Sequence, residues 1–238
     1  MENLQPKYKR VLLKLSGEAL AKDCNGILNF EYIEQIASVL KKCVAEGVQI
    51  AIVVGAGNIW RGRQSGKMDR ARADQMGMLA TAINSLALEE TFNSVGLKSR
   101  AMMVMEVNSF ADPYRIRDAR CHLDEGEVVI IGGGTGMPFF STDTAAAIHA
   151  AEIGADVILM AKNIDGIYTA DPHVDSNAKR YDEITYREIL DKELKALDIP
   201  ASAFCMENDI KCYAFELKDP MNIYKVIMGE KMGTELHR

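Results

Sequence analysis

The chain has 238 residues, of which 48% are hydrophobic and 26% are charged, as is usual for a soluble globular protein. This composition excludes a disordered, collagen-like or wholly coiled-coil chain, and the length allows one large domain or two small ones. The formal net charge of −6 argues against a nucleic-acid-binding protein that relies on its overall charge. We therefore expect no nucleic acid among its partners.

The compartment can be inferred from the N-terminus and the cysteines. The apolar run at the N-terminus is too short for a signal peptide, and no stretch approaches the roughly 18 apolar residues of a membrane span. The five cysteines are odd in number and show no spacing typical of metal ligands. They are expected to be small buried side chains in a reducing environment. The sequence thus predicts a cytoplasmic protein without a membrane partner.

Strand-like and helix-like segments alternate along most of the chain. They predict a strand at 10–15, a helix at 31–46, a strand at 48–54, a long helix at 72–95 and a strand at 99–105. Next come a helix at 113–123, opened by Asp112 and Pro113, a strand at 127–131, a helix at 144–153 and a strand at 156–160. After a polar, turn-rich segment at 162–179, we expect helices at 186–197, 201–208 and 219–229 and a strand at 211–217.

Strands that alternate with helices and are apolar on both faces favour a parallel sheet covered by helices on both sides, an α/β fold. No linker rich in proline, glycine or serine divides the chain. We therefore expect a single domain over 1–238, with two functional lobes at roughly 1–160 and 161–238.

Glycine follows three of the predicted strands, at 16–17, 55–58 and 132–136. Glycine lets backbone N–H groups approach an anion closely, and a following helix N-terminus favours negative charge. Each turn by itself could be purely structural, but three in one α/β chain favour phosphate binding. The sequence matches neither of two known phosphate-binding motifs. Arg61 stands where the P-loop pattern needs a glycine, and Trp60 and Met137 stand where the dinucleotide-binding pattern needs one.

Charged residues near these turns are candidates for chemistry. Lys14 ends a buried strand, where a lysine needs an anionic partner. Arg61 directly follows the second glycine turn, whereas the neighbouring basic residues at 63, 67, 70 and 72 are better read as a solvated loop. Asp143 lies between two threonines at a helix start, so it is either a helix cap or an acid that faces the phosphate site. Asp74 is by default a surface acid that suits the helix dipole.

The four histidines show neither ligand spacing nor a Ser/His/Asp order. His122, His149, His173 and His237 are therefore expected to be surface or packed residues, and no metal site is predicted.

Several segments together resemble a known family. These are KLSGEAL at 14–20, GAGNIWRG at 55–62, RADQMGMLAT at 72–81, GGGTGMPFFSTDTAAA at 132–147, KNIDGIYTADP at 162–172 and MGEKMGT at 228–234. In order and spacing they resemble the bacterial uridylate (UMP) kinases of the amino-acid-kinase fold family, over nearly the whole chain. The resemblance implies a three-layer αβα sandwich with a mainly parallel central sheet.

The resemblance also implies a reaction, transfer of the ATP γ-phosphoryl group to UMP in pyrimidine nucleotide biosynthesis. It implies Mg²⁺ with the ATP, and a homohexamer. Lys14, Arg61 and Asp143 would carry the catalysis, with Asp143 organising Lys14. Asp74 would hold the ribose of UMP, and Tyr168 would lie against adenine.

Position by position, the resemblance assigns further residues to each nucleotide. The ATP site would comprise Lys14, Leu15, Ser16, Gly17, Gly57, Arg61, Lys162, Asn163, Tyr168 and Asp171. The UMP site would comprise Ala56, Asp74, Thr135, Gly136, Met137, Pro138, Phe139, Phe140, Ser141 and Thr142. Ala56 departs from the family, which usually has a third glycine there.

Two other functions remain open at this point. The first is another phosphotransferase of the same family, acting on glutamate, carbamate, aspartate or a phosphorylated isoprenoid, which would not need the segments around Asp74 and Asp143. The second is a protein of this fold that binds a nucleotide or oxyanion without turnover. Loss of Lys14, Arg61 or Asp143 would favour the second, and all three are present.

Overall fold

The central element of the fold is one open sheet. A computed structural model describes residues 5–61, 66–107, 109–172, 174–175, 177–194 and 196–238. In this part of the chain nine strands form a single sheet in the order β4-β3-β5-β2-β1-β6-β8-β9-β7. All pairings are parallel except that of β8 with β9. The strands are β1 (Arg10–Leu15), β2 (Gln49–Val54), β3 (Ser99–Met103), β4 (Asp112–Pro113), β5 (Val128–Gly132), β6 (Val157–Lys162), β7 (Glu183–Thr185), β8 (Cys212–Glu216) and β9 (Thr234–His237).

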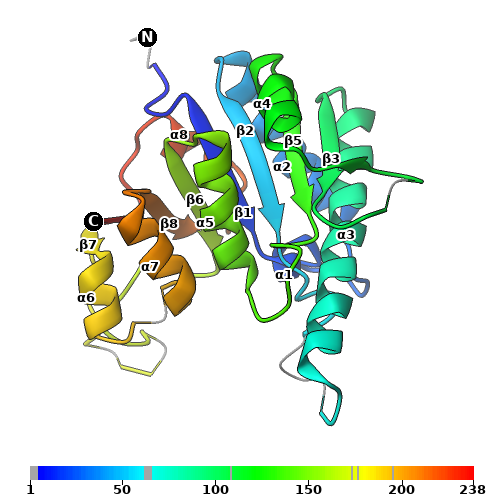
Figure 1. The fold of residues 1–238 in the computed structure, drawn as a ribbon. Coiled ribbons are helices and arrows are strands. Elements are labelled where there is room, and N and C mark those ends of the chain that lie inside the picture. Colours follow the sequence, from blue (N-terminus) through cyan, green and yellow to red (C-terminus); the bar gives the residue numbers. More distant parts are fainter. Residues whose placement is uncertain (1–4, 62–65, 108, 173, 176, 195) are drawn as a thin grey trace.

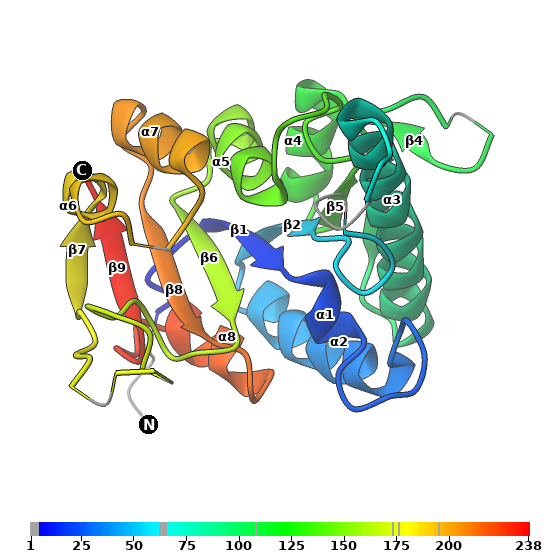
Figure 2. The same cartoon turned by 90° about the horizontal axis from the view of Figure 1, so that it is seen from below.

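Helices cover both faces of this sheet (Figure 2), so the expected three-layer α/β architecture is confirmed. Helices α2 (Phe30–Ala45) and α8 (Met221–Ile227) lie on one face, together with the second half of α3 (Arg70–Ser94). The opposite face carries α4 (Ile116–Asp124), α5 (Thr142–Ile153), α6 (Tyr186–Asp191) and α7 (Ile199–Glu207). The first half of α3 extends past the carboxyl ends of the strands, where the short α1 (Gly17–Leu20) also lies (Figure 1).

The side chains of β1 point alternately to the two faces of the sheet and so contribute to both core layers. Val11, Leu13 and Leu15 are fully buried against the face of α2 and α8, while Leu12 is buried against the face of α5. Successive side chains of a strand point to opposite faces, so Lys14 follows Leu12 toward α5. Fully burying a leucine contributes about 1.5–3 kcal/mol, which makes this central strand a major source of stability.

The structure differs from the predicted elements mainly at the sheet edges. The helix expected to open at Asp112 and Pro113 begins instead at Ile116, because Asp112 and Pro113 pair with Met102 and Met103 as an edge strand. Proline has no N–H and is tolerated at such an edge. The helix expected at 186–197 ends at Asp191. The short elements α1, β4, β7 and β9 were not predicted.

The cysteines follow their expected environment only in part. Cys43, Cys205 and Cys212 are buried, whereas Cys24 is half-buried and Cys121 is exposed. Cys205 and Cys212 lie 4.0 Å apart, Sγ to Sγ, a proximity the sequence did not suggest. Among the described residues, no helix is long and apolar enough to cross a membrane.

Candidate active site

The three glycine turns meet at one edge of the sheet. Because β5, β2, β1 and β6 are adjacent and parallel, their carboxyl ends lie side by side. A Cβ added to Gly17 would lie 2.7 Å from the Gly55 carbonyl oxygen and 2.8 Å from the Gly57 nitrogen. The turn after β1 thus packs backbone to backbone against the turn after β2, which only glycine permits at position 17.

A first pocket, of about 450 Å³, opens between the turns after β2 and β5 and the first half of α3. It contains many of the residues that the resemblance assigns to UMP, namely Ala56, Asp74, Thr135, Met137, Phe140, Ser141 and Thr142. Gly57 and Arg61, assigned to ATP, also line this pocket. Gly136, Pro138 and Phe139 do not line it. The side chain of Phe139 is 64% exposed, and its backbone has a positive φ of 73°.

Asp74 joins two walls of this first pocket. Its carboxylate accepts hydrogen bonds from the Arg70 side chain at 2.8 and 3.0 Å and from the Phe139 backbone N–H at 2.9 Å. Asp74 therefore ties α3 to the loop that follows β5. Arg70, expected to be solvated, is 47% exposed and forms this ion pair.

A second pocket, of about 600 Å³, lies at the carboxyl ends of β1 and β6. It is lined by most residues assigned to ATP, namely Lys14, Ser16, Lys162, Asn163, Tyr168 and Asp171. Leu15 and Gly17 do not line it, since Leu15 is buried in the core and Gly17 packs against the neighbouring turn. Residues from both expected lobes contribute to this pocket.

Glu18 lines both pockets and marks the place where they meet. Its carboxylate forms an ion pair with Arg61. A Cβ on Gly57 would lie 2.7 Å from the same carboxylate, so the second glycine turn approaches Glu18 closely. Of the other basic residues in this stretch, Lys67 and Arg72 are exposed, and Arg63 lies outside the described residues.

The anionic partner that Lys14 requires is Asp143. Lys14 Nζ lies 2.7 Å from Asp143 Oδ1, and the two side chains are 16% and 21% exposed. Asp143 is not the N-cap of α5, because the Ser141 side chain accepts hydrogen bonds from the N–H groups of Asp143 and Thr144. The capping alternative for Asp143 is therefore wrong, and its carboxylate is directed to Lys14.

The electrostatics of this cluster follow from burial and charge. Burial alone would raise the pKa of Asp143, but the Lys14 ammonium, helped by Lys162, outweighs it and holds the pKa below its usual value. Burial lowers the pKa of Lys162, while Asp143 opposes that shift. The Lys162 ammonium also donates a hydrogen bond to the Ala196 carbonyl at 2.5 Å. One carboxylate thus interacts electrostatically with two lysines that line the second pocket.

Some lining residues were missed by sequence reasoning. Glu18, Trp60, Met78 and Thr81 all line the first pocket. Trp60 donates its indole N–H to the Ala73 carbonyl at 2.8 Å, which fixes the loop after β2 against α3. The motifs that carry the resemblance include all four residues, so their presence there was the available signal.

Comparison with known proteins identifies the family that shares this fold. Residues 9–215 match the model of the amino acid kinase family. The chain belongs to this family. Two solved structures of UMP kinases are similar over nearly the full length. The Bacillus anthracis enzyme is 36% identical with a TM-score of 0.92, covering 97% of this chain and 96% of that one. The Ureaplasma parvum enzyme is 35% identical with a TM-score of 0.92, covering 97% and 99%.

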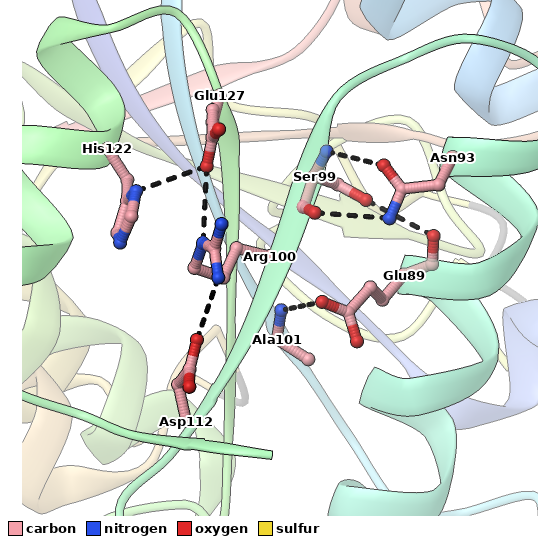
Figure 3. A network of polar contacts seen from close by, with 8 residues as sticks. All are labelled: Glu89, Asn93, Ser99, Arg100, Ala101, Asp112, His122 and Glu127. Atoms are coloured by element: carbon pink, nitrogen blue, oxygen red, sulfur yellow. Dashed lines mark hydrogen bonds and ion pairs between the residues drawn. The ribbon is translucent and has the colours of Figure 1, made fainter. Parts of the chain in front are cut away.

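A second polar cluster lies away from both pockets, near the outer strands (Figure 3). His122, Glu125 and Glu127 bring their ligand atoms within 4.8 Å of one another, a proximity the sequence did not predict. However, Arg100 already forms ion pairs with Glu127 at 3.3 Å and Asp112 at 2.8 Å. A guanidinium beside Glu127 repels a metal cation, so we interpret the cluster as an ion-pair network.

Proposed function

We propose that this protein is a UMP kinase that transfers the γ-phosphoryl group of ATP to UMP, giving UDP and ADP. The observation that carries the proposal is the junction of two nucleotide-sized pockets at Glu18, beside the Lys14–Asp143 pair. Phosphoryl transfer between two nucleotides requires such a junction, because donor and acceptor phosphates must meet in line. The two similar UMP kinases, 35–36% identical over 97% of the chain, support the choice of acceptor.

The charges at the junction suit this chemistry. Lys14 and Arg61 would stabilise the transferring group, and backbone N–H groups of the glycine turns would hold the phosphates. Asp143 would keep Lys14 oriented toward the junction. In the second pocket, Lys162, Asn163, Tyr168 and Asp171 would bind ATP, with Tyr168 against the adenine.

The acceptor side needs orientation more than activation. The attacking phosphate oxygen of UMP is largely ionised near pH 7, so no general base is required. Asp74 would hold the ribose, and the loop 135–142 would surround the nucleoside. Arg61 would be released from Glu18 when a phosphate offers a stronger anionic partner.

Magnesium would enter with ATP. Mg²⁺ in kinases is bound largely by substrate phosphates and waters, with few carboxylates. Asp143 and Glu18 are each paired with a basic residue, so the site offers few free carboxylates, as suits an ion held largely by the ATP phosphates. The ion would neutralise charge on the ATP phosphates.

The test is a coupled assay of ADP release with ATP, Mg²⁺ and a panel of UMP, CMP, dUMP, glutamate and carbamate. We expect turnover with UMP far above that with the other acceptors. Turnover with an amino acid or carbamate and none with UMP would overturn the proposal in favour of another family member. Nucleotide binding without any turnover would point to a non-catalytic protein.

Assembly and cellular role are part of the same proposal. A homohexamer in the cytoplasm, serving pyrimidine nucleotide biosynthesis, is expected from the family resemblance. The exposed Leu79 and Ile83, 53% and 48% exposed on α3, support an apolar contact there. Light scattering should give a mass near six chains, and a stable, active monomer at micromolar concentration would contradict the assembly.

A further inference from the structure

His149 is a buried histidine that the proposed chemistry does not use. It lies on α5 with 3% of its surface exposed. Its Nδ1 is 2.7 Å from Glu152 Oε2, and its Nε2 is 2.9 Å from the Gly134 carbonyl oxygen. The Tyr114 ring packs edge-on against it, with ring centroids 4.9 Å apart.

Both partners of this imidazole are hydrogen-bond acceptors. A neutral imidazole has one N–H donor and one unprotonated nitrogen, so it can satisfy only one of them. The Gly134 carbonyl cannot donate. Glu152 also accepts a hydrogen bond from the Tyr114 hydroxyl at 2.8 Å, and the His149 hydrogen bond lowers the pKa of Glu152 despite its burial. Both hydrogen bonds to these acceptors form only when each ring nitrogen carries a proton, as in an imidazolium paired with a carboxylate.

The Gly134 carbonyl, which accepts the hydrogen bond from His149 Nε2, belongs to the glycine turn after β5. Gly134 has a positive φ of 61° and lines the first pocket together with Thr135. The turn is held on its other side by α3, where the Gly133 N–H donates to Thr81 Oγ1 at 2.9 Å. His149 supplies the anchor from α5.

We propose that His149 is a positioning residue whose imidazolium holds the Gly134 turn in the shape that binds the acceptor nucleotide, so that acceptor binding weakens when the proton is lost. The inference rests on the proposed function for its kinetic readout. His149 would act on the first pocket through the Gly134 turn and does not itself line that pocket. The second pocket should be unaffected.

The groups around His149 decide which nitrogen loses its proton. Those facing this site are Glu152 on the same helix, Tyr114 before α4, and Arg120 of α4, which donates to the Glu152 backbone carbonyl. The carboxylate keeps the proton on Nδ1, so deprotonation occurs at Nε2. Its lone pair then faces the Gly134 carbonyl oxygen, and the repulsion releases the turn.

The kinetic test compares the pH dependence of KM in the wild type and in His149→Arg, which keeps a cation with several donors. We expect the wild-type KM for UMP to rise roughly tenfold when the hydrogen bond from His149 Nε2 to the Gly134 carbonyl is lost, the size of one charge-assisted hydrogen bond. The KM for ATP should stay flat and kcat should change less. The ratio of mutant to wild-type KM cancels the titration of UMP itself. An identical pH profile in both proteins would overturn the proposal.

Two further variants keep this test decisive. Glu152→Gln retains an acceptor for Tyr114 but removes the anion, and it should move the rise in KM to lower pH even if His149→Arg folds poorly. His122→Gln alters a histidine in the separate cluster of Figure 3 and should leave the wild-type profile unchanged. A profile altered equally by His122→Gln would contradict the assignment to His149.

A spectroscopic test does not depend on activity. NMR of protein labelled with ¹⁵N-histidine should show one imidazole, absent in His149→Arg, with both nitrogens protonated under the conditions in which the KM for UMP is low. A spectrum in which Nε2 of His149 is unprotonated throughout would overturn the inference. If UMP is not turned over at all, the proposed function fails while this spectrum still tests His149.

Discussion

Replacing Asp143 by asparagine should separate its electrostatic role from its place in the helix. Asparagine has the same shape, and α5 retains its cap because Ser141 provides it. The change therefore removes little besides the negative charge. It leaves the Lys14 ammonium, whose Nζ is 2.7 Å from Oδ1, without a counterion and close to Lys162.

The size of the effect follows from the burial of the pair. Lys14 and Asp143 are 16% and 21% exposed, so solvent screens them only in part. A hydrogen bond to a charged group contributes about 1.5–3 kcal/mol. For a chain of this size each kcal/mol corresponds to a Tm change of roughly 2–4 °C, so Tm should fall by roughly 3–12 °C. The value of kcat should fall at least about 10²-fold, as for other preorganised electrostatic groups.

The stability difference should also depend on pH. The pKa of Asp143 is held below its ordinary value of 3.8, so the folded state binds its proton more weakly than the unfolded state. The stabilisation is therefore complete well above pH 3.8 and is lost as the pH falls through the lower pKa of the folded state. The Tm gap between wild type and Asp143→Asn should be constant from about pH 5 to 7 and shrink in acid.

The assays are thermal melts at several pH values and steady-state kinetics with ATP and UMP. Asp156→Asn is a matched control, because Asp156 accepts hydrogen bonds from the Lys9 and Arg10 N–H groups at the opposite end of β1. It should lower Tm without lowering kcat. If Asp143→Asn also lowers only Tm and keeps full kcat, the pair is purely structural and our assignment is wrong.

Two other substitutions test the junction. Lys14→Ala should reduce kcat at least about 10²-fold and weaken ATP binding less, and a kcat near that of the wild type would remove Lys14 from the chemistry. Gly17→Ala should destabilise the fold by about 1–3 kcal/mol in chemical unfolding, because its Cβ meets the Gly55 and Gly57 backbone. Gly26→Ala, whose Cβ has no neighbour closer than 3.9 Å, is the control, and equal losses in both variants would contradict the packing argument.

The sequence could predict the central sheet because local patterns determine it. The run at 10–15 is apolar on both faces, which requires burial on both sides, and glycine after it indicates a close approach of backbones. β9 could not be found this way, since Thr234–His237 is short and only Thr234 and Leu236 are fully buried. Its pairing with β7 and β8 arises from tertiary contacts that no local periodicity records.

In the candidate site, too, local sequence predicts some features and tertiary contacts determine the others. A lysine at the end of a buried strand predicts an anionic partner, but not which one. Asp143 becomes that partner because β1 is central and α5 covers the face toward which Lys14 points. Glu18 was overlooked because it reads as an ordinary acid of a short helix, and only the folding of α1 against the second glycine turn places it between the pockets.

Asp74 is the residue at which a specificity role and a structural role must be separated. It lies beyond the first turn of α3, so the helix dipole gains little from it. Its carboxylate holds Arg70 and the Phe139 N–H, and it also lines the first pocket, where it can accept hydrogen bonds from both ribose hydroxyls.

If Asp74 binds ribose, Asp74→Ala should raise KM for UMP roughly 10–100-fold, the equivalent of 1.5–3 kcal/mol, and leave KM for ATP unchanged. It should also narrow the preference for UMP over dUMP, because a site built to bond a hydroxyl discriminates against its absence. Arg70→Ala breaks the same ion pair without removing the carboxylate, so it should leave the UMP/dUMP ratio intact. If Arg70→Ala reproduces both changes, Asp74 acts only by bracing the loop, whereas a ratio altered in Asp74→Ala alone assigns the ribose contact to its carboxylate.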